Sequence, residues 1–199
     1  MNPGLPPSLW AMLEGRLWHA TEPSGLAAIV AAQKIHVSTS SRYQASFCRC
    51  VNSVSLFDFG PTAAGICSQF HNWVGWLGHQ QGTRVVVWLE VDRVACGDRL
   101  LDAGSAKGRW DSNSSDRCKT FIPGVEACHR GPIPLSAVVG ILLVADDCRE
   151  RPRYCGAPIN EDIGSEIDLF EIELPPPPPD DPTVATLRAG LSRRHSGEG

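Results

Sequence analysis

A run of five consecutive prolines, residues 175–179, limits how far the folded part of this chain can extend. Each proline fixes φ at about −65° and lacks a backbone N–H, so neither a helix nor an inner strand can pass through the run. We expect a stiff, extended spacer there. The 199-residue chain therefore divides into one folded domain over residues 1–174 and a Pro-rich spacer with a disordered tail over residues 175–199.

The composition is that of a folded protein without a membrane partner. Hydrophobic residues make up 42% and charged residues 20%, so a core can form. The longest nearly uninterrupted apolar run, residues 137–145, is about half of the roughly 20 residues that cross a bilayer. The first residues show no basic stretch followed by an apolar one. We therefore expect a cytoplasmic monomer.

Net charge and cysteine spacing argue against two further classes of protein. A net charge of −4 disfavours a protein that coats nucleic acid through bulk positive charge, although it allows a local basic groove. The eight cysteines form no CxxC pair, and Cys48 and Cys50 are the closest two. We therefore expect reduced, small buried thiols and no metal site, with a structural zinc as the alternative.

The hydrophobic pattern predicts a single α+β domain with mostly antiparallel strands and few helices. A helix is expected over residues 24–34, where the preceding residues carry a helix-start signal. Residues 96–116 are rich in Gly, Ser, Asp and Asn and are expected to form a long surface loop. Five segments are expected to be extended, the second of them inside the sheet: residues 54–59, 83–91, 121–128, 137–144 and 167–174.

His19 and Thr21 are the first candidate functional residues. They lie two positions apart in the segment LWHAT, so on a strand both side chains point to the same side, where both can hydrogen-bond to sugar hydroxyls. A histidine near a strand end more often has a structural role, so a functional role for His19 needs support from other residues. Glu126, in the segment GVEACHR, is the second candidate, either as an exposed carboxylate or as a catalytic one.

This arrangement resembles the ADP-ribosyltransferase superfamily, in the branch with an H-x-T first motif that includes poly(ADP-ribose) polymerase-like domains, RNA 2′-phosphotransferases and DNA-modifying toxins. The matching features are His19 and Thr21, the helix that follows them, and Glu126 before a late apolar strand. The resemblance covers residues 17–144. It implies a split β core, NAD as co-substrate, and an enzyme that transfers ADP-ribose to a macromolecular acceptor, either nucleic acid or protein.

The resemblance also implies a role for each matching residue. The segment of His19, Ala20 and Thr21 would bind NAD, with His19 at the nicotinamide ribose or a phosphate and Thr21 at the adenosine-side ribose. Glu126 would hold the 2-hydroxyl of the reacting ribose and stabilise its oxocarbenium-like transition state. His19 and Glu126 are thus the predicted catalytic residues.

The middle motif departs from the clearest family members, which place a tyrosine on a central strand to stack on nicotinamide. Tyr43 is one candidate for this role, and Phe57 or Phe59 is the alternative, because the role requires an aromatic face. Arg42 is predicted to contact the NAD pyrophosphate or a substrate phosphate. The structural alternatives are core aromatics and a surface arginine.

Two other functions stay open: a 2′-phosphotransferase-type reaction on RNA that uses NAD, and a non-catalytic binding module on the same fold. Acceptor contacts are expected on residues 96–116 and their flank, since binding residues tend to lie on loops over a rigid sheet. The cations there are Arg99, Lys107, Arg109 and Arg117. His129 and Arg130 either line an acceptor pocket or form a solvated turn.

Overall fold

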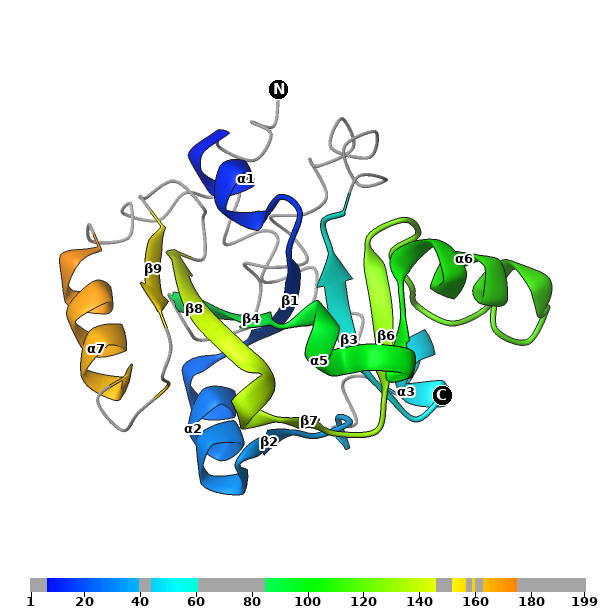
Figure 1. The fold of residues 1–199 in the computed structure, drawn as a ribbon, viewed down its shortest axis with the longest axis horizontal. Helices are drawn as coiled ribbons and strands as arrows, with labels where there is room; N and C mark the ends of the chain where they lie inside the picture. The colour runs from blue at the N-terminus through cyan, green and yellow to red at the C-terminus, as the bar shows by residue number, and fades with distance from the viewer. Residues whose placement is uncertain are drawn as a thin grey trace, which may run out of the picture.

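The computed structural model describes residues 7–39, 44–60, 85–145, 152–156, 159 and 163–174. The strands are β1 (Leu17–Thr21), β2 (Lys34–Ile35), β3 (Ser53–Asp58), β4 (Val85–Val91), β5 (Leu100–Leu101), β6 (Glu126–Arg130), β7 (Ile133–Pro134), β8 (Val138–Ala145) and β9 (Arg153–Gly156). Seven of them form one sheet in the order β5-β6-β3-β1-β4-β8-β9, and β2 pairs with β7 in a second, smaller sheet (Figure 1). Every pair of neighbouring strands is antiparallel. The predicted α+β class with a mostly antiparallel sheet is confirmed.

Helices cover both faces of the large sheet. They are α1 (Pro7–Leu13), α2 (Pro23–Ala32), α3 (Phe47–Cys50), α5 (Arg93–Cys96), α6 (Ala103–Ser112) and α7 (Ile163–Glu173), with short 3-10 helices η4 (Gly97–Arg99) and η5 (Leu135–Ala137). α2 and α7 pack on one face and α1 on the other. In the described part of the chain, no helix has the length and apolar character needed to cross a bilayer.

β4 shows why the large sheet has a core on each side. Val87 and Leu89 belong to the core beneath α2 and α7, while Val86 and Trp88 belong to the core beneath α1. Alternate residues of a strand point to opposite faces, so a nearly continuous apolar run suits a strand that is covered on both sides. β4 lies between β1 and β8, and its predicted place inside the sheet is confirmed.

Residues 96–116 do not form the expected long loop. They contain η4, β5 and α6, and α6 begins where the Asp102 side chain accepts a hydrogen bond of 2.7 Å from the Ser105 N–H. This N-cap supplies a partner for one of the amides at the helix start. Ala103 and Ala106 are buried, so small residues that suggested a loop give α6 a narrow packing face.

The last expected strand, residues 167–174, is also wrong, because this segment belongs to α7 and its following turn. Ile167, Phe170 and Leu174 are buried at a spacing of three and four residues, which is the period of a helix face. The segment 121–128 is extended only from Glu126 onward, since the residues before it form a turn. Helix α2 and strands β3 and β8 agree with their predictions within a few residues.

The expectation that all cysteines are reduced thiols is wrong for one pair. Cys48 on α3 and Cys128 on β6 form a disulfide, with a Cα–Cα distance of 5.6 Å. Both residues are buried in a small core that α3 and α6 form with Phe121. Among the free cysteines of the described residues, Cys96 is the buried thiol that the sequence led us to expect.

Candidate active site

His19 lies on β1, and its Nδ1 is 3.0 Å from the backbone carbonyl oxygen of Ser55 on β3. Because a carbonyl oxygen only accepts hydrogen bonds, Nδ1 carries the hydrogen and donates it. Burial lowers the pKa of His19, and the hydrogen bond to Ser55 opposes that shift. The imidazole is therefore neutral near about pH 7, and its Nε2 offers a lone pair to a hydroxyl group of a ligand.

Glu126 is the first residue of β6, and its carboxylate accepts two hydrogen bonds. The Ser55 hydroxyl donates to Oε1 over 2.8 Å, and the Ile122 backbone N–H donates to Oε2 over 2.9 Å. Only 6% of Glu126 is exposed. Burial raises its pKa to about 7, and the two hydrogen bonds limit this rise. Glu126 is therefore a buried, oriented carboxyl rather than the exposed carboxylate that was the structural alternative.

The raised pKa of Glu126 predicts a pH-dependent stability. The pKa of Glu126 is higher in the folded than in the unfolded protein. Its contribution to the unfolding free energy is therefore complete at low pH and is lost as pH rises through about 7. In the variant Glu126→Gln this loss is absent. The variant should therefore gain roughly 2–3 kcal/mol of unfolding free energy relative to wild type between about pH 5 and about pH 8.5. Urea unfolding of both proteins at the two pH values measures this difference, and a constant difference would contradict the assignment.

Ser55 is the residue that joins the two predicted catalytic side chains, and the sequence did not single it out. It lies on β3, between β1 with His19 and β6 with Glu126. Its backbone carbonyl accepts from His19, and its hydroxyl donates to Glu126. The sequence shows Ser55 only as a hydroxyl residue within the extended segment VSLFDF. Its link to both candidates depends on the strand order, which no local sequence pattern reveals.

The imidazole and the carboxylate reach Ser55 from opposite faces of the sheet. Trp18 pairs with Phe57, and Phe57 pairs with Glu126, so these three side chains lie on one face. His19 follows Trp18 and begins on the other face. The strand register between β1 and β3 ends at Trp18, so the β3 side of β1 is unpaired from His19 onward. The two side chains thus meet at one residue, beside the point where the two strands stop pairing.

Thr21 lies on the same face as His19, as predicted, and its hydroxyl sits against the first turn of α2. A Cβ atom added at Gly25 would lie 2.1 Å from the Thr21 Oγ1. Such a distance is not tolerated, so the absence of a side chain at Gly25 allows the observed placement of Thr21. The helix that follows the H-x-T segment therefore helps to position that hydroxyl.

Phe57, the alternative to Tyr43, belongs to an aromatic cluster and lies directly across from Glu126. Its ring is tilted against Trp88 at a centroid distance of 5.2 Å and stacks with Phe59 at 6.5 Å. Phe59 is fully buried and Phe57 is half-buried, so Phe57 is the better placed of the two to meet a ligand. Ala20, opposite Trp88, packs beside the same cluster.

Arg42 and Tyr43, the predicted phosphate and nicotinamide contacts, lie outside the described residues. The other five of the seven predicted residues that bind or react lie on β1, β3 and β6, which are neighbours in the sheet. Ala20, Phe57 and Glu126 are on the face of Trp18, whereas His19 and Thr21 are on the opposite face. In the part of the chain that is described, no cluster of His, Cys, Asp and Glu residues is suited to a metal ion.

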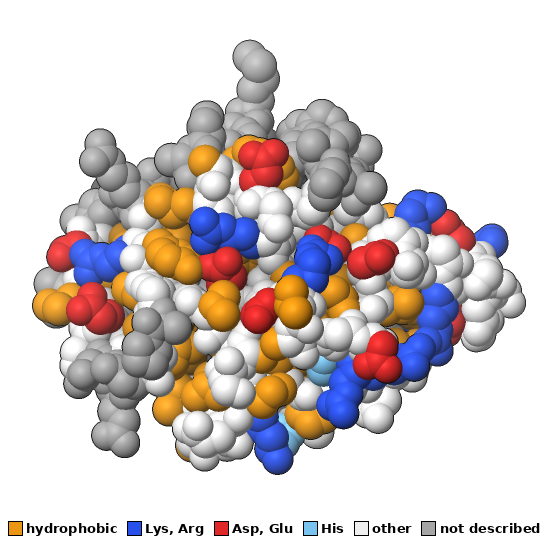
Figure 2. All heavy atoms as spheres, in the orientation of Figure 1, with side chains coloured by type: hydrophobic (Ala, Val, Ile, Leu, Met, Phe, Trp, Pro, Cys, Tyr) orange, Lys and Arg blue, Asp and Glu red, His pale blue; other side chains and the backbone are white. Residues whose placement is uncertain are grey.

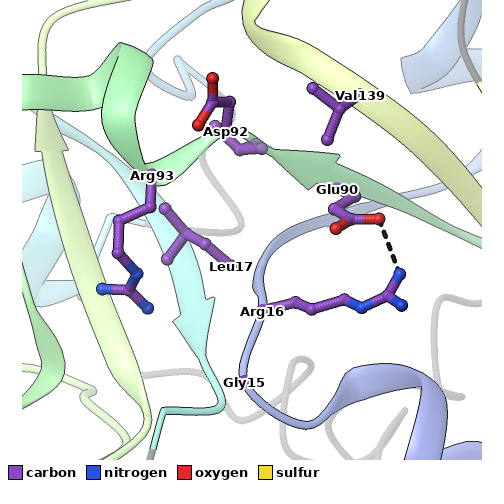
Figure 3. Close-up of a pocket in the computed structure, with 8 residues that line it drawn as sticks. Gly15, Arg16, Leu17, Glu90, Asp92, Arg93 and Val139 are labelled. Carbon is purple, nitrogen blue, oxygen red and sulfur yellow. Dashed lines mark hydrogen bonds and ion pairs between the residues drawn. The ribbon is translucent and has the colours of Figure 1, made fainter.

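A pocket of about 240 Å³ opens at the start of β1, away from the predicted residues (Figure 3). Arg93 and Leu17 line one side, and Val139 lies at the other side near Glu90, which forms an ion pair of 3.0 Å with Arg16. Arg93 is engaged with the buried Asp58. Arg16, Glu90 and Arg93 are thus ion-paired within the protein, and Asp92 accepts a hydrogen bond from the Val94 N–H. None of the predicted site residues lines this pocket.

Comparison of the chain with protein families, curated proteins and solved structures finds no match.

Proposed function

We propose that this protein is an NAD-dependent ADP-ribosyltransferase that cleaves the bond between nicotinamide and ribose and transfers ADP-ribose to a macromolecule. The observation that carries the proposal is the contact of His19 and Glu126 with the same residue, Ser55. These two residues were selected for their resemblance to a family motif and are far apart in the sequence. They touch Ser55 from opposite faces of the sheet, so a sugar that contacts both side chains would have to lie where β1 and β3 stop pairing, beyond Trp18.

The side chains suit the two ends of the reacting ribose. The Nε2 of the neutral His19 can accept a hydrogen bond from a ribose hydroxyl or a neighbouring group of NAD. The carboxylate of Glu126 can accept one from the 2-hydroxyl. The side of β1 that does not pair with β3 leaves the backbone at Ala20 available to the amide of nicotinamide.

Glu126 would act through electrostatics that are in place before the reaction. When the bond between C1′ and the nicotinamide nitrogen breaks, its electron pair leaves with neutral nicotinamide, and positive charge develops on the ribose. The acceptor atom then forms a bond to C1′ and releases its proton. Hydrogen bonds from Ser55 and Ile122 fix the Glu126 carboxylate, so it needs little rearrangement to stabilise that charge.

The test is to incubate the protein with NAD labelled in its adenosine half, in separate mixtures with protein, DNA and RNA. Release of free nicotinamide together with label in one macromolecular pool supports the proposal. A non-catalytic module would release no nicotinamide. Transfer of a 2′-phosphate from RNA to NAD would identify the phosphotransferase-type reaction instead.

Gly25→Ala tests the placement of Thr21 without changing Thr21 itself. The new Cβ forces the Thr21 hydroxyl to rotate away, so one hydrogen bond to NAD is lost and the Kd for NAD should rise about fivefold. Thr21→Val should give a similar rise. Gly108→Ala is the matched control, since nothing lies within 4 Å of a Cβ at that helical position. Equal NAD affinity in all three variants and wild type, measured by calorimetry, would remove Thr21 from the site.

A further inference from the structure

One margin of the molecule carries exposed basic side chains from both sheets. We define the basic edge as Lys34, His36, Arg99 and Arg130, all of which are exposed. Figure 2 shows Lys and Arg side chains gathered along the lower right margin, with histidine beside them, where Figure 1 places β6, β7 and the start of α6. A local concentration of cations contrasts with the net charge of −4 for the whole chain.

The strand pairing explains why these residues share one margin. Arg99 precedes Leu100, and Arg130 follows His129, which pairs with Leu100. The two arginines therefore leave the β5–β6 pair at the same end. The chain then continues into β7, which pairs with β2 and so brings Lys34 and His36 to the same side of the molecule.

No ion pair among the described residues neutralises the arginines and the lysine of the basic edge, although Figure 2 shows an acidic side chain between the basic ones. Ion pairs engage Arg16, Arg93, Lys107 and Arg153, but in the described part of the chain none involves Arg99, Arg130 or Lys34. Asp98 is the acidic neighbour of Arg99 in the chain. Like charges at neighbouring positions of paired strands are destabilising, so two arginines at one strand end indicate a surface that gains by binding an anion.

His129 is not part of the basic edge, although the sequence analysis assigned it the same two alternatives as Arg130. It is buried, and its Nδ1 donates to the Gly131 carbonyl oxygen over 3.1 Å. This bond holds the turn that leads out of β6 and leaves Arg130 at the surface. Arg130 is thus presented by a structured turn, which lowers the entropic cost of fixing it on a ligand.

We propose that the basic edge binds the phosphates of a single-stranded nucleic acid, which is then the acceptor of ADP-ribose; this inference rests on the proposed function. A row of cations matches the regularly spaced charges of a phosphodiester backbone, and the arginine fork suits phosphate oxygens. Glu126 and Arg130 stand at the two ends of β6, about 13 Å apart along the strand. A nucleic acid bound at the basic edge would therefore lie within about 13 Å of Glu126, the residue proposed to hold the reacting ribose. A base must be unstacked to react, which favours a single strand over a duplex.

The experiment measures binding of a labelled single-stranded oligonucleotide of about 12 nucleotides, as DNA and as RNA, by fluorescence anisotropy. The double variant Arg99→Gln/Arg130→Gln should weaken binding at least about tenfold and reduce the slope of log K against log salt by about 1.4. Arg99→Lys/Arg130→Lys should retain most of the affinity. Arg153→Gln, on the opposite edge strand β9, is the control and should bind as wild type.

Binding is measured without NAD, so its failure is distinct from failure of the proposed reaction. Glu126→Gln should bind the oligonucleotide as wild type even though it is expected to cleave NAD at least about 10²-fold more slowly. Binding of DNA, of RNA or of both, with loss in the double variant, supports the inference and identifies the preferred sugar. Binding of neither, equal binding by the double variant, or label transfer to protein alone overturns it.

Discussion

Glu126→Gln is expected to lower the rate of nicotinamide release from NAD by a factor between about 10² and 10³ while the protein stays folded. Removal of one fixed electrostatic contact to a transition state has an effect of this size in other enzymes, equivalent to about 3–4 kcal/mol of activation free energy. The neutral amide cannot stabilise the cationic ribose as a carboxylate does. The rate constant kcat should therefore fall more than the affinity for NAD.

The geometry explains why this variant should fold. The amide oxygen of Gln can accept from the Ile122 N–H, and its NH₂ group can donate to the Ser55 hydroxyl, which rotates to accept. Both hydrogen bonds of the native carboxylate are thus replaced. Far-UV circular dichroism and the unfolding midpoint check that the fold is intact. Glu171→Gln, an exposed change on α7, is the matched control and should release nicotinamide at the wild-type rate.

The pKa of Glu126 adds a second readout to the same experiment. Since the carboxylate form stabilises the ribose cation, kcat/KM of the wild type should rise with pH through about 7, the value that burial gives to Glu126 in the free protein. The residual activity of Glu126→Gln should not show this rise. Equal activity and equal pH profiles in both proteins would exclude Glu126 from the reaction, and the binding-module interpretation would then replace the enzyme.

The parts of the fold that the sequence predicted are those in which one pattern dominates. β4 is a long β-branched run, and α2 follows a clear start signal, so local preference and tertiary context agree. In α7 the segment IDLFEIEL fits both a period of two and a helical period. Leu169 is 51% exposed on the helix. A large apolar residue at an exposed helix position weakens the helical pattern, so the sequence favoured an alternating strand. Only the packing of Phe170 and Ile167 against the sheet distinguishes the two.

The candidate site divides in the same way. His19, Thr21 and Glu126 were found because their residue types and order resemble a family motif. Ser55 was not found, because its importance arises from the strand order β6-β3-β1, which brings β3 between two segments distant in the sequence. The cysteine pair was missed for the same reason, since the 80 residues that separate Cys48 from Cys128 give no spacing signal.

Reduction of the Cys48–Cys128 disulfide is expected to lower the unfolding free energy by about 4 kcal/mol. The bond closes a loop of 80 residues, and the entropy that such a closure removes from the unfolded chain accounts for an effect of this size. The double variant Cys48→Ser/Cys128→Ser should lose a similar amount or more, because it also places two hydroxyl groups in the buried cluster around Phe47 and Phe121.

Urea unfolding with and without a dithiol reductant measures this stabilisation. Cys50→Ser, which changes an exposed free thiol on the same helix, is the control and should respond to the reductant as wild type does. Alkylation of the denatured, unreduced protein followed by peptide mass spectrometry should recover a cross-linked pair that contains Cys48 and Cys128. Because Cys128 lies opposite Ser55 in the β3–β6 pair, the disulfide also anchors the strand that carries Glu126. Unfolding curves that the reductant leaves unchanged, with both cysteines alkylated, would show that these residues are the reduced thiols that the sequence led us to expect.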